Sequence, residues 1–211
     1  MLRVALIGEL SGVHKNLKSG LNSHGCDTIL VSNGDGWKRI DGDLQFSLKN
    51  RSVVSVVKFI LQLLIIFLRV RNYDVVQFAQ PQVFPVKFGI NRFLMRSLIR
   101  NNKRTFLLIG GCNDFITAKY FKSHENYRQW YQAMLGGKLI LDCEAAKNKN
   151  FTKFLLDQVD GCIPLLHEYT LGLKDVNYPK LMPAIQLPLD IDAVKIKPNS
   201  LGEKLRIFHG H

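Results

Sequence analysis

The chain alternates between short apolar runs and segments in which apolar residues recur every three or four positions. The short runs are bounded by Gly, Asn, Asp or Pro, as buried strands are, and they cover 2–8, 27–32, 73–78, 104–109, 161–164 and 184–187. The periodic segments predict helices over 13–24, 53–71, 85–98, 127–134 and 151–155. Strands that alternate with helices predict an α/β, Rossmann-like, doubly wound fold with a mainly parallel sheet. Its ligand sites are expected at the carboxyl ends of the strands.

The last part of the chain departs from this alternation. Residues 189–203, which include the segment Lys-Pro-Asn-Ser at 197–200, predict an interdomain linker after a first domain over 1–188. Residues 204–211 then form another apolar run, with Leu205, Ile207 and Phe208. A single strand cannot bury its own apolar face, so this run predicts the first strand of a truncated C-terminal domain.

The net charge indicates which ligands the protein attracts, and the cysteine content indicates its location. The 211 residues carry a net charge of +12, which attracts nucleic acid, anionic lipid or phosphorylated ligands. The four cysteines form no C-x-x-C pair, so neither a metal site nor a disulfide framework is expected, and a cytoplasmic location is the simplest reading. The apolar segment 53–70 is interrupted by Ser, Lys, Gln and Arg, and therefore predicts a buried crossover helix and no membrane span.

Common enzyme signatures are missing from the sequence. The first turn, 8–12, has the form G-x-x-x-G, and strand 27–32 is followed by Asn33 and no acidic residue, which argues against a dinucleotide cofactor. The sequence contains no phosphate-binding G-x-x-x-x-G-K-[ST], no H-E-x-x-H and no G-x-S-x-G. No cofactor or metal is therefore expected.

Polar and glycine residues gather at the predicted strand ends, where a Rossmann-like sheet binds its ligands. The candidate substrate-binding residues are Glu9, Gly12, His14, Asp35, Gln77, Gln80, Gly110, Gly111, Asn113 and His167. The candidate catalytic residues are Asp114 and Glu168, because removal of a proton from a hydroxyl group requires a carboxylate or histidine within reach. Each also has a structural interpretation: Asn113 and Asp114 can cap a helix, and the glycines can relieve backbone crowding.

The order and spacing of several motifs resemble a known family. They are RVALIG at 3–8 with Gly12 and His14, GDGW at 34–37, YDVVQ at 73–77, GGCND at 110–114, DGCIP at 160–164, LPLD at 187–190 and KLRIFHG at 204–210. In this order they resemble the N-terminal half of GT-B glycosyltransferases of the glycosyltransferase 4 type. Many members carry a histidine after the fourth strand, where this chain has Gly110 or Gly111.

The resemblance implies that this half binds a saccharide acceptor, while the C-terminal half binds most of the nucleotide-sugar donor. It also implies that the turn around Gly12 faces the donor phosphates. Together with the positive charge, the resemblance predicts transfer to a lipid-linked acceptor in bacterial surface polysaccharide synthesis. The protein is expected in the cytoplasm, peripheral at the inner face of an anionic membrane. This chain is expected to be incomplete and inactive alone. Two alternatives remain: a basic nucleic-acid-binding α/β module, for which no binding motif is found, and a stand-alone flavodoxin-like regulatory domain.

Overall fold

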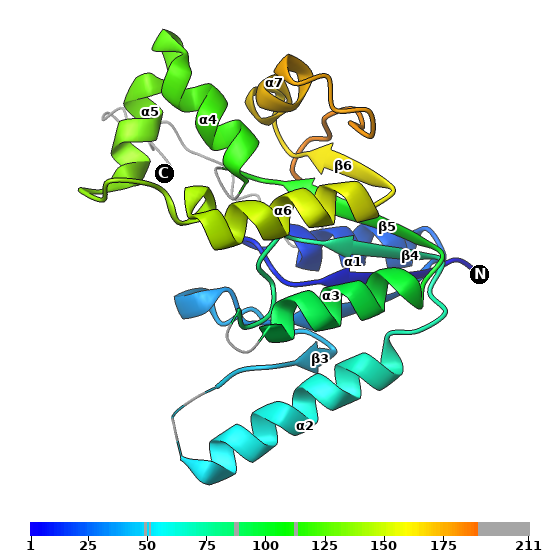
Figure 1. Ribbon diagram of the computed structural model, residues 1–211. Helices are drawn as coiled ribbons and strands as arrows, with labels where there is room; N and C mark the ends of the chain where they lie inside the picture. The colour runs from blue at the N-terminus through cyan, green and yellow to red at the C-terminus, as the bar shows by residue number, and fades with distance from the viewer. Residues whose placement is uncertain (49, 51, 87–88, 112–113, 190–211) are drawn as a thin grey trace, which may run out of the picture.

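A single parallel sheet organises the chain. The computed structural model describes residues 1–48, 50, 52–86, 89–111 and 114–189. Six strands in the order β3-β2-β1-β4-β5-β6 pair in parallel, which confirms the predicted Rossmann-like α/β fold (Figure 1). They are β1 (Arg3–Ile7), β2 (Asp27–Ser32), β3 (Leu44–Gln45), β4 (Val75–Phe78), β5 (Arg104–Ile109) and β6 (Gly161–Pro164). The chain builds outward from β1 to β3 and then returns to β4, so the strand order reverses between β1 and β4.

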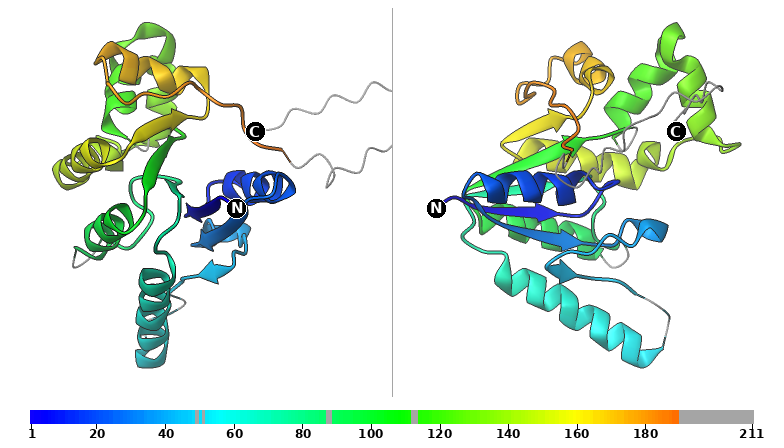
Figure 2. Two further views of the ribbon diagram at one scale, coloured as in Figure 1. Left: turned by 90° about the vertical axis from the view of Figure 1, so that its right-hand side faces the viewer. Right: turned by 180° about the vertical axis from the view of Figure 1, so that it is seen from behind.

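Both faces of the sheet are covered by helices. Helix α1 (Val13–Ser23) packs on the face that carries Val4 and Leu6 of β1. The opposite face, with Ala5 and Ile7, packs against α2 (Val53–Arg69), α3 (Ile90–Arg100) and α6 (Ala146–Gln158), as the two views of Figure 2 show. Alternate β1 side chains thus enter two cores, which explains why its sequence is apolar throughout.

The remaining helices lie around the carboxyl edge of the sheet. Helices α4 (Phe115–Ser123) and α5 (Glu125–Leu135) form a hairpin that projects beyond the end of β5, and α7 (His167–Asp175) packs against α4 (Figure 1). Phe121 and Tyr131 are buried at the centre of this group. Two short 3-10 helices, η1 (Gly36–Lys38) and η3 (Asp142–Glu144), lie in the loops.

Three sequence expectations were wrong. The helix over 53–70 is not buried, because only Phe59, Leu63 and Ile66 of α2 are enclosed and its other side is exposed. Residues 184–187 do not form a strand. This part of the chain pairs with β6 through one bridge, between Leu181 and Cys162. Within 184–187, the Ile185 N–H donates one hydrogen bond to the Pro164 carbonyl oxygen (3.0 Å), which is too little for a ladder. Helix α3 begins at Ile90 instead of near Pro85, since the loop before it is held by Asn91, whose side chain bonds to backbone groups of Phe84 and Pro81.

The expected linker and second domain lie almost entirely outside the described residues. Most of the linker over 189–203 and the whole final run over 204–211 lie beyond the described residues. Within the described part of the chain, no helix is both long and apolar enough to cross a bilayer.

Candidate functional site

The first turn of the fold lies at the point where the strand order reverses. Glu9, which follows β1, is buried, and its carboxylate accepts hydrogen bonds from the N–H groups of Leu10 (2.7 Å), His14 (3.2 Å) and Lys15 (2.9 Å). A helix start normally offers these N–H groups to an anion. Here the chain's own carboxylate occupies that position.

A second carboxylate joins this turn to the loop after β2. Asp35 accepts a hydrogen bond from the Ser11 N–H (2.7 Å) and forms an ion pair with Lys38 at 3.1 Å. The Lys38 ammonium also donates to the Ser11 hydroxyl (2.5 Å). Ser11 and Asp35 both have positive φ angles, of 54° and 48°. Three polar side chains therefore fix the two loops against each other.

His14 and Gln77, both predicted to bind substrate, lie inside the fold. The His14 ring is fully buried: its Nδ1 is 2.7 Å from the Gly8 carbonyl oxygen and its Nε2 is 3.3 Å from the Gln77 side-chain nitrogen. A carbonyl oxygen can only accept, so Nδ1 donates and the neutral Nε2 accepts from Gln77. Burial lowers the His14 pKa to about 4 despite the bond to Gly8. The pair links the first turn to β4 as a neutral buried contact.

Gly12 is the open position of the first turn. A Cβ atom added there would meet nothing within 4 Å, and its φ is 86°, a conformation that side chains other than glycine rarely adopt. Among the N–H groups of residues 8–16, that of Gly12 alone has no partner in the described part of the chain. The contact between Gly12 and donor phosphates stays a prediction. In the described part of the molecule, the turn has one free N–H group, that of Gly12, to donate to such a ligand.

The two glycines after β5 differ in surroundings. A Cβ atom on Gly110 would lie 2.7 Å from a methyl carbon of Leu10 and 2.9 Å from one of Leu165, whereas Gly111, with a φ of 114°, faces open space. The space beside Gly110 is therefore filled by the protein's own side chains. Gly111 is the one that leaves room for a ligand.

This packing gives a prediction with a matched control. Gly110→Ala should reduce the free energy of unfolding by about 1 kcal/mol, because two leucine side chains must move. Gly20→Ala, inside α1 with nothing within 4 Å of the added methyl group, should instead increase it by roughly 0.5–1 kcal/mol. Urea unfolding of both variants measures the difference, and equal effects would contradict the packing role of Gly110.

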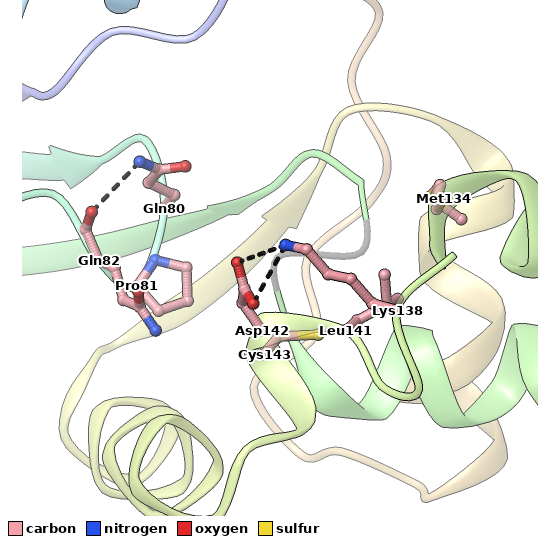
Figure 3. Close-up of a pocket in the computed structure, with 8 residues that line it drawn as sticks. All are labelled: Gln80, Pro81, Gln82, Met134, Lys138, Leu141, Asp142 and Cys143. Atoms are coloured by element: carbon pink, nitrogen blue, oxygen red, sulfur yellow. Dashed lines mark hydrogen bonds and ion pairs between the residues drawn. The ribbon is translucent and has the colours of Figure 1, made fainter. Parts of the chain in front are cut away.

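A pocket of about 320 Å³, here called the carboxyl-edge pocket, opens between the loop after β4 and the segment after α5 (Figure 3). It is lined by Gln80, Pro81, Gln82, Met134, Lys138, Leu141, Asp142 and Cys143. Lys138 and Asp142 form an ion pair at 3.4 Å, with side chains 62% and 82% exposed. Such a pair gains little from its own contact and can rearrange around a ligand. Amides, an ammonium and a carboxylate together donate and accept hydrogen bonds.

The two predicted catalytic carboxylates differ in exposure. Asp114 is only 1% exposed and caps α4, since one carboxylate oxygen accepts from the N–H groups of Ile116 (2.9 Å) and Thr117 (2.8 Å). Burial raises its pKa. Glu168 lies in the first turn of α7, half-buried and without a hydrogen bond or ion pair to any described residue, beside the exposed His167. The predicted residue Asn113 lies outside the described residues.

The structure thus divides the predicted residues. Glu9, Gly12, His14, Asp35 and Gln77 come together around the first turn, while Gln80 alone lines the carboxyl-edge pocket. The pocket residues Lys138, Leu141, Asp142 and Cys143 were missed. Their one sequence signal is Gly136–Gly137, both with positive φ, which ends α5 and turns the chain back to the sheet.

Comparison with known proteins adds little. No protein-family model matches the chain, and no curated protein matches it. One structural match is the crystal structure of the protein lin1944 from Listeria innocua, with 10% sequence identity over 89% of each chain and a TM-score of 0.39. Similarity of that degree carries no argument about function.

Proposed function

We propose that this chain is the acceptor-binding half of a GT-B glycosyltransferase, which transfers a sugar from a nucleotide donor to a saccharide acceptor. The observation that carries the proposal is the carboxyl-edge pocket, which lies where doubly wound sheets bind ligands. Its volume is within the range of small-molecule sites. The order of the sequence motifs, which resembles that family, is the second support.

The chemistry of the pocket suits a hydroxyl-rich ligand. The amide of Gln80 can both donate and accept, and Lys138 and Asp142 supply a donor and an acceptor on the same side of the pocket. Met134 and Leu141 add an apolar surface for the carbon face of a sugar ring. A phosphate-specific site would instead need several converging cations or free N–H groups, and the lining residues include a single cation.

The donor belongs mainly to the other half. Two carboxylates already occupy the start of α1, and the free Gly12 N–H is a small contribution to binding a nucleotide diphosphate. We therefore assign the donor to a second domain that faces this edge of the sheet. Since the proposed acceptor is lipid-linked, we place the protein at the cytoplasmic face of a membrane, as a peripheral component.

Titration of the chain with saccharides, followed by NMR, tests this proposal. We expect weak binding, with Kd on the order of 1 mM, and signal changes at the pocket residues. Gln80→Ala should weaken binding about three- to tenfold, which is the loss of one or two hydrogen bonds. The matched control is Gln158→Ala, at the exposed end of α6 near the amino edge of the sheet, and should bind as the unaltered chain does.

Two results would contradict the proposal. Saccharide binding that Gln80→Ala leaves unchanged would place the acceptor elsewhere. Micromolar binding of a nucleotide sugar to this chain alone, about −8 kcal/mol, would show that it is a self-sufficient donor site.

A further inference from the structure

The outer face of α2 is unusually apolar for a helix on the surface of a protein. Its inner side chains Phe59, Leu63 and Ile66 are buried against the sheet. The outer face, as the term is used below, consists of aliphatic side chains that are 37% to 79% exposed: Val53, Val54, Val56, Val57, Ile60, Leu61, Leu64, Ile65 and Leu68. A helix packed on one side only normally turns polar residues to water. A contiguous apolar surface of this kind marks a binding face.

The net positive charge is concentrated in the part of the sequence that contains this helix. Residues 44–113 hold eleven lysine and arginine residues and one acidic residue, Asp74, so this third of the chain accounts for ten of the twelve net positive charges. On α2 itself, Lys58 and Arg69 are exposed and there is no acidic residue. The helix that carries the apolar outer face thus also carries two exposed basic side chains and no acidic one.

The position of α2 leaves its outer face accessible. The helix runs along the outside of the molecule, beside β3 and α3 and on the far side from the α4–α5 hairpin, in all three views (Figures 1 and 2). Phe93 of α3 is 63% exposed and its ring stacks on Phe67 of α2 with centroids 5.8 Å apart. The exposed apolar surface thus continues from α2 onto α3.

We propose that the outer face of α2 is the surface by which this protein lies on an anionic lipid bilayer. Aliphatic residues that enter the boundary between headgroups and acyl chains, with basic residues beside them, are the features that bind a helix in the plane of a membrane. The 17 residues of α2 give about 26 Å of helix for this contact. Charge decides against a second copy of the chain as the occupant, because pairing through α2 would bring together two helices that each carry exposed basic residues and no acidic residue.

This inference deepens the membrane location given in the proposed function and rests on it, but it does not rest on sugar transfer. Its test uses neither sugar nor nucleotide, so the saccharide titration and the lipid experiment can fail separately. The probe is co-sedimentation of the chain with vesicles of phosphatidylglycerol and phosphatidylcholine, compared with vesicles of phosphatidylcholine alone. Binding is expected only to the anionic vesicles at about 0.1 M salt. It should fall at least tenfold at about 1 M, where the Debye length shrinks from about 10 Å to about 3 Å.

Two double variants separate the apolar and the basic contributions. Ile60→Ser with Leu64→Ser should lower binding at least tenfold without a change in net charge. Lys58→Gln with Arg69→Gln should lower it roughly 25-fold, about fivefold for each basic residue. The matched control replaces two exposed aliphatic residues outside α2, Leu2→Ser with Val176→Ser, and should bind normally. Thermal melts of all three confirm that the changes, at exposed positions, leave the fold intact.

Three outcomes would overturn the inference. Equal binding to neutral and anionic vesicles would remove the role of charge. Full binding by the Ile60→Ser, Leu64→Ser variant would place the contact elsewhere. A chain that is dimeric without lipid, and monomeric when Ile60 and Leu64 are replaced, would show that the outer face covers a second copy instead.

Discussion

Acidification from pH 6.5 to pH 4 should remove about 3 kcal/mol from the free energy of unfolding through His14 alone. Its pKa is about 4 in the folded protein against an ordinary value of 6.5. Well above pH 6.5 the ring is neutral in both states and contributes no pH dependence. Between pH 6.5 and pH 4 the ring is protonated in the unfolded chain but neutral in the folded one. The free energy of unfolding therefore falls by about 1.4 kcal/mol for each unit by which the pH is lowered. The raised pKa of Asp114 acts in the opposite sense, because protonation of this buried carboxylate favours the fold.

Urea unfolding across this pH range, on the unaltered chain and two variants, measures the effect. In His14→Asn, an amide can still donate to the Gly8 carbonyl oxygen but cannot titrate, so the slope should be much flatter, even though overall stability is lower. His24→Asn, at the exposed end of α1, should keep the original slope. Asp43 and Asp74 have lowered pKa values, and their contributions are lost only at more acid pH. An unchanged slope in His14→Asn would mean that another group causes the acid loss.

In the proposed complete transferase, with both of its domains present, Glu168→Gln should reduce turnover by about 100-fold or more, while Asp114→Asn should change it only a few-fold. In an inverting transfer the acceptor oxygen bonds to the sugar's anomeric carbon, the bond to the diphosphate breaks, and the hydroxyl proton passes to a base. That base must reach the hydroxyl group. Glu168 is half-buried and unpaired among the described residues, whereas Asp114 is enclosed and caps α4.

Stability measurements on the same variants complete the comparison. Asn caps a helix as well as Asp does, and it removes a carboxylate whose raised pKa means that its charge becomes unfavourable to the fold as pH rises. Asp114→Asn should therefore be at least as stable as the unaltered protein at pH 7, and Asp114→Ala about 1 kcal/mol less stable. Glu168→Gln should melt normally. Normal turnover in Glu168→Gln, with a large loss in Asp114→Asn, would reverse the assignment.

Local patterns predicted most of the fold because they act within a few residues. The apolar runs of β1, β2, β4, β5 and β6 and the start of α2 were found from the sequence. At that start, the Ser52 hydroxyl accepts a hydrogen bond from the Ser55 N–H and caps the helix, as a serine before an apolar periodic segment commonly does. The failure at 184–187 shows the limit: Ile185 and Leu187 read as a strand, but they are 41% and 52% exposed. An apolar run forms a strand only where a sheet edge is available to pair with it, and the residues of the run do not determine that.

The candidate site was less predictable, because tertiary contacts decide what a side chain is used for. Both His14 and Gln77 were expected at strand ends, where they could bind a substrate. The structure places His14 in the first turn of α1 and Gln77 within β4, where the two side chains instead bond to each other inside the core. The wall of the carboxyl-edge pocket comes from residues about 60 positions after Gln80 in the chain. The segment that forms this wall is joined to α5 by a hydrogen bond from the Tyr131 hydroxyl to the Glu144 carboxylate, a contact that no short motif specifies.

The pairing of β1 with β4 also constrains how the chain is synthesised. Val4 lies opposite Val75, so one side of the central strand has no neighbour until some 70 further residues have been made. At about 5–20 residues per second this delay lasts roughly 4 to 14 s. During that time the nascent chain already displays β1, β2 and the apolar segment of α2 without the strands that later shelter them. During this interval the exposed apolar surface is open to aggregation, which ends only when β4 pairs with β1.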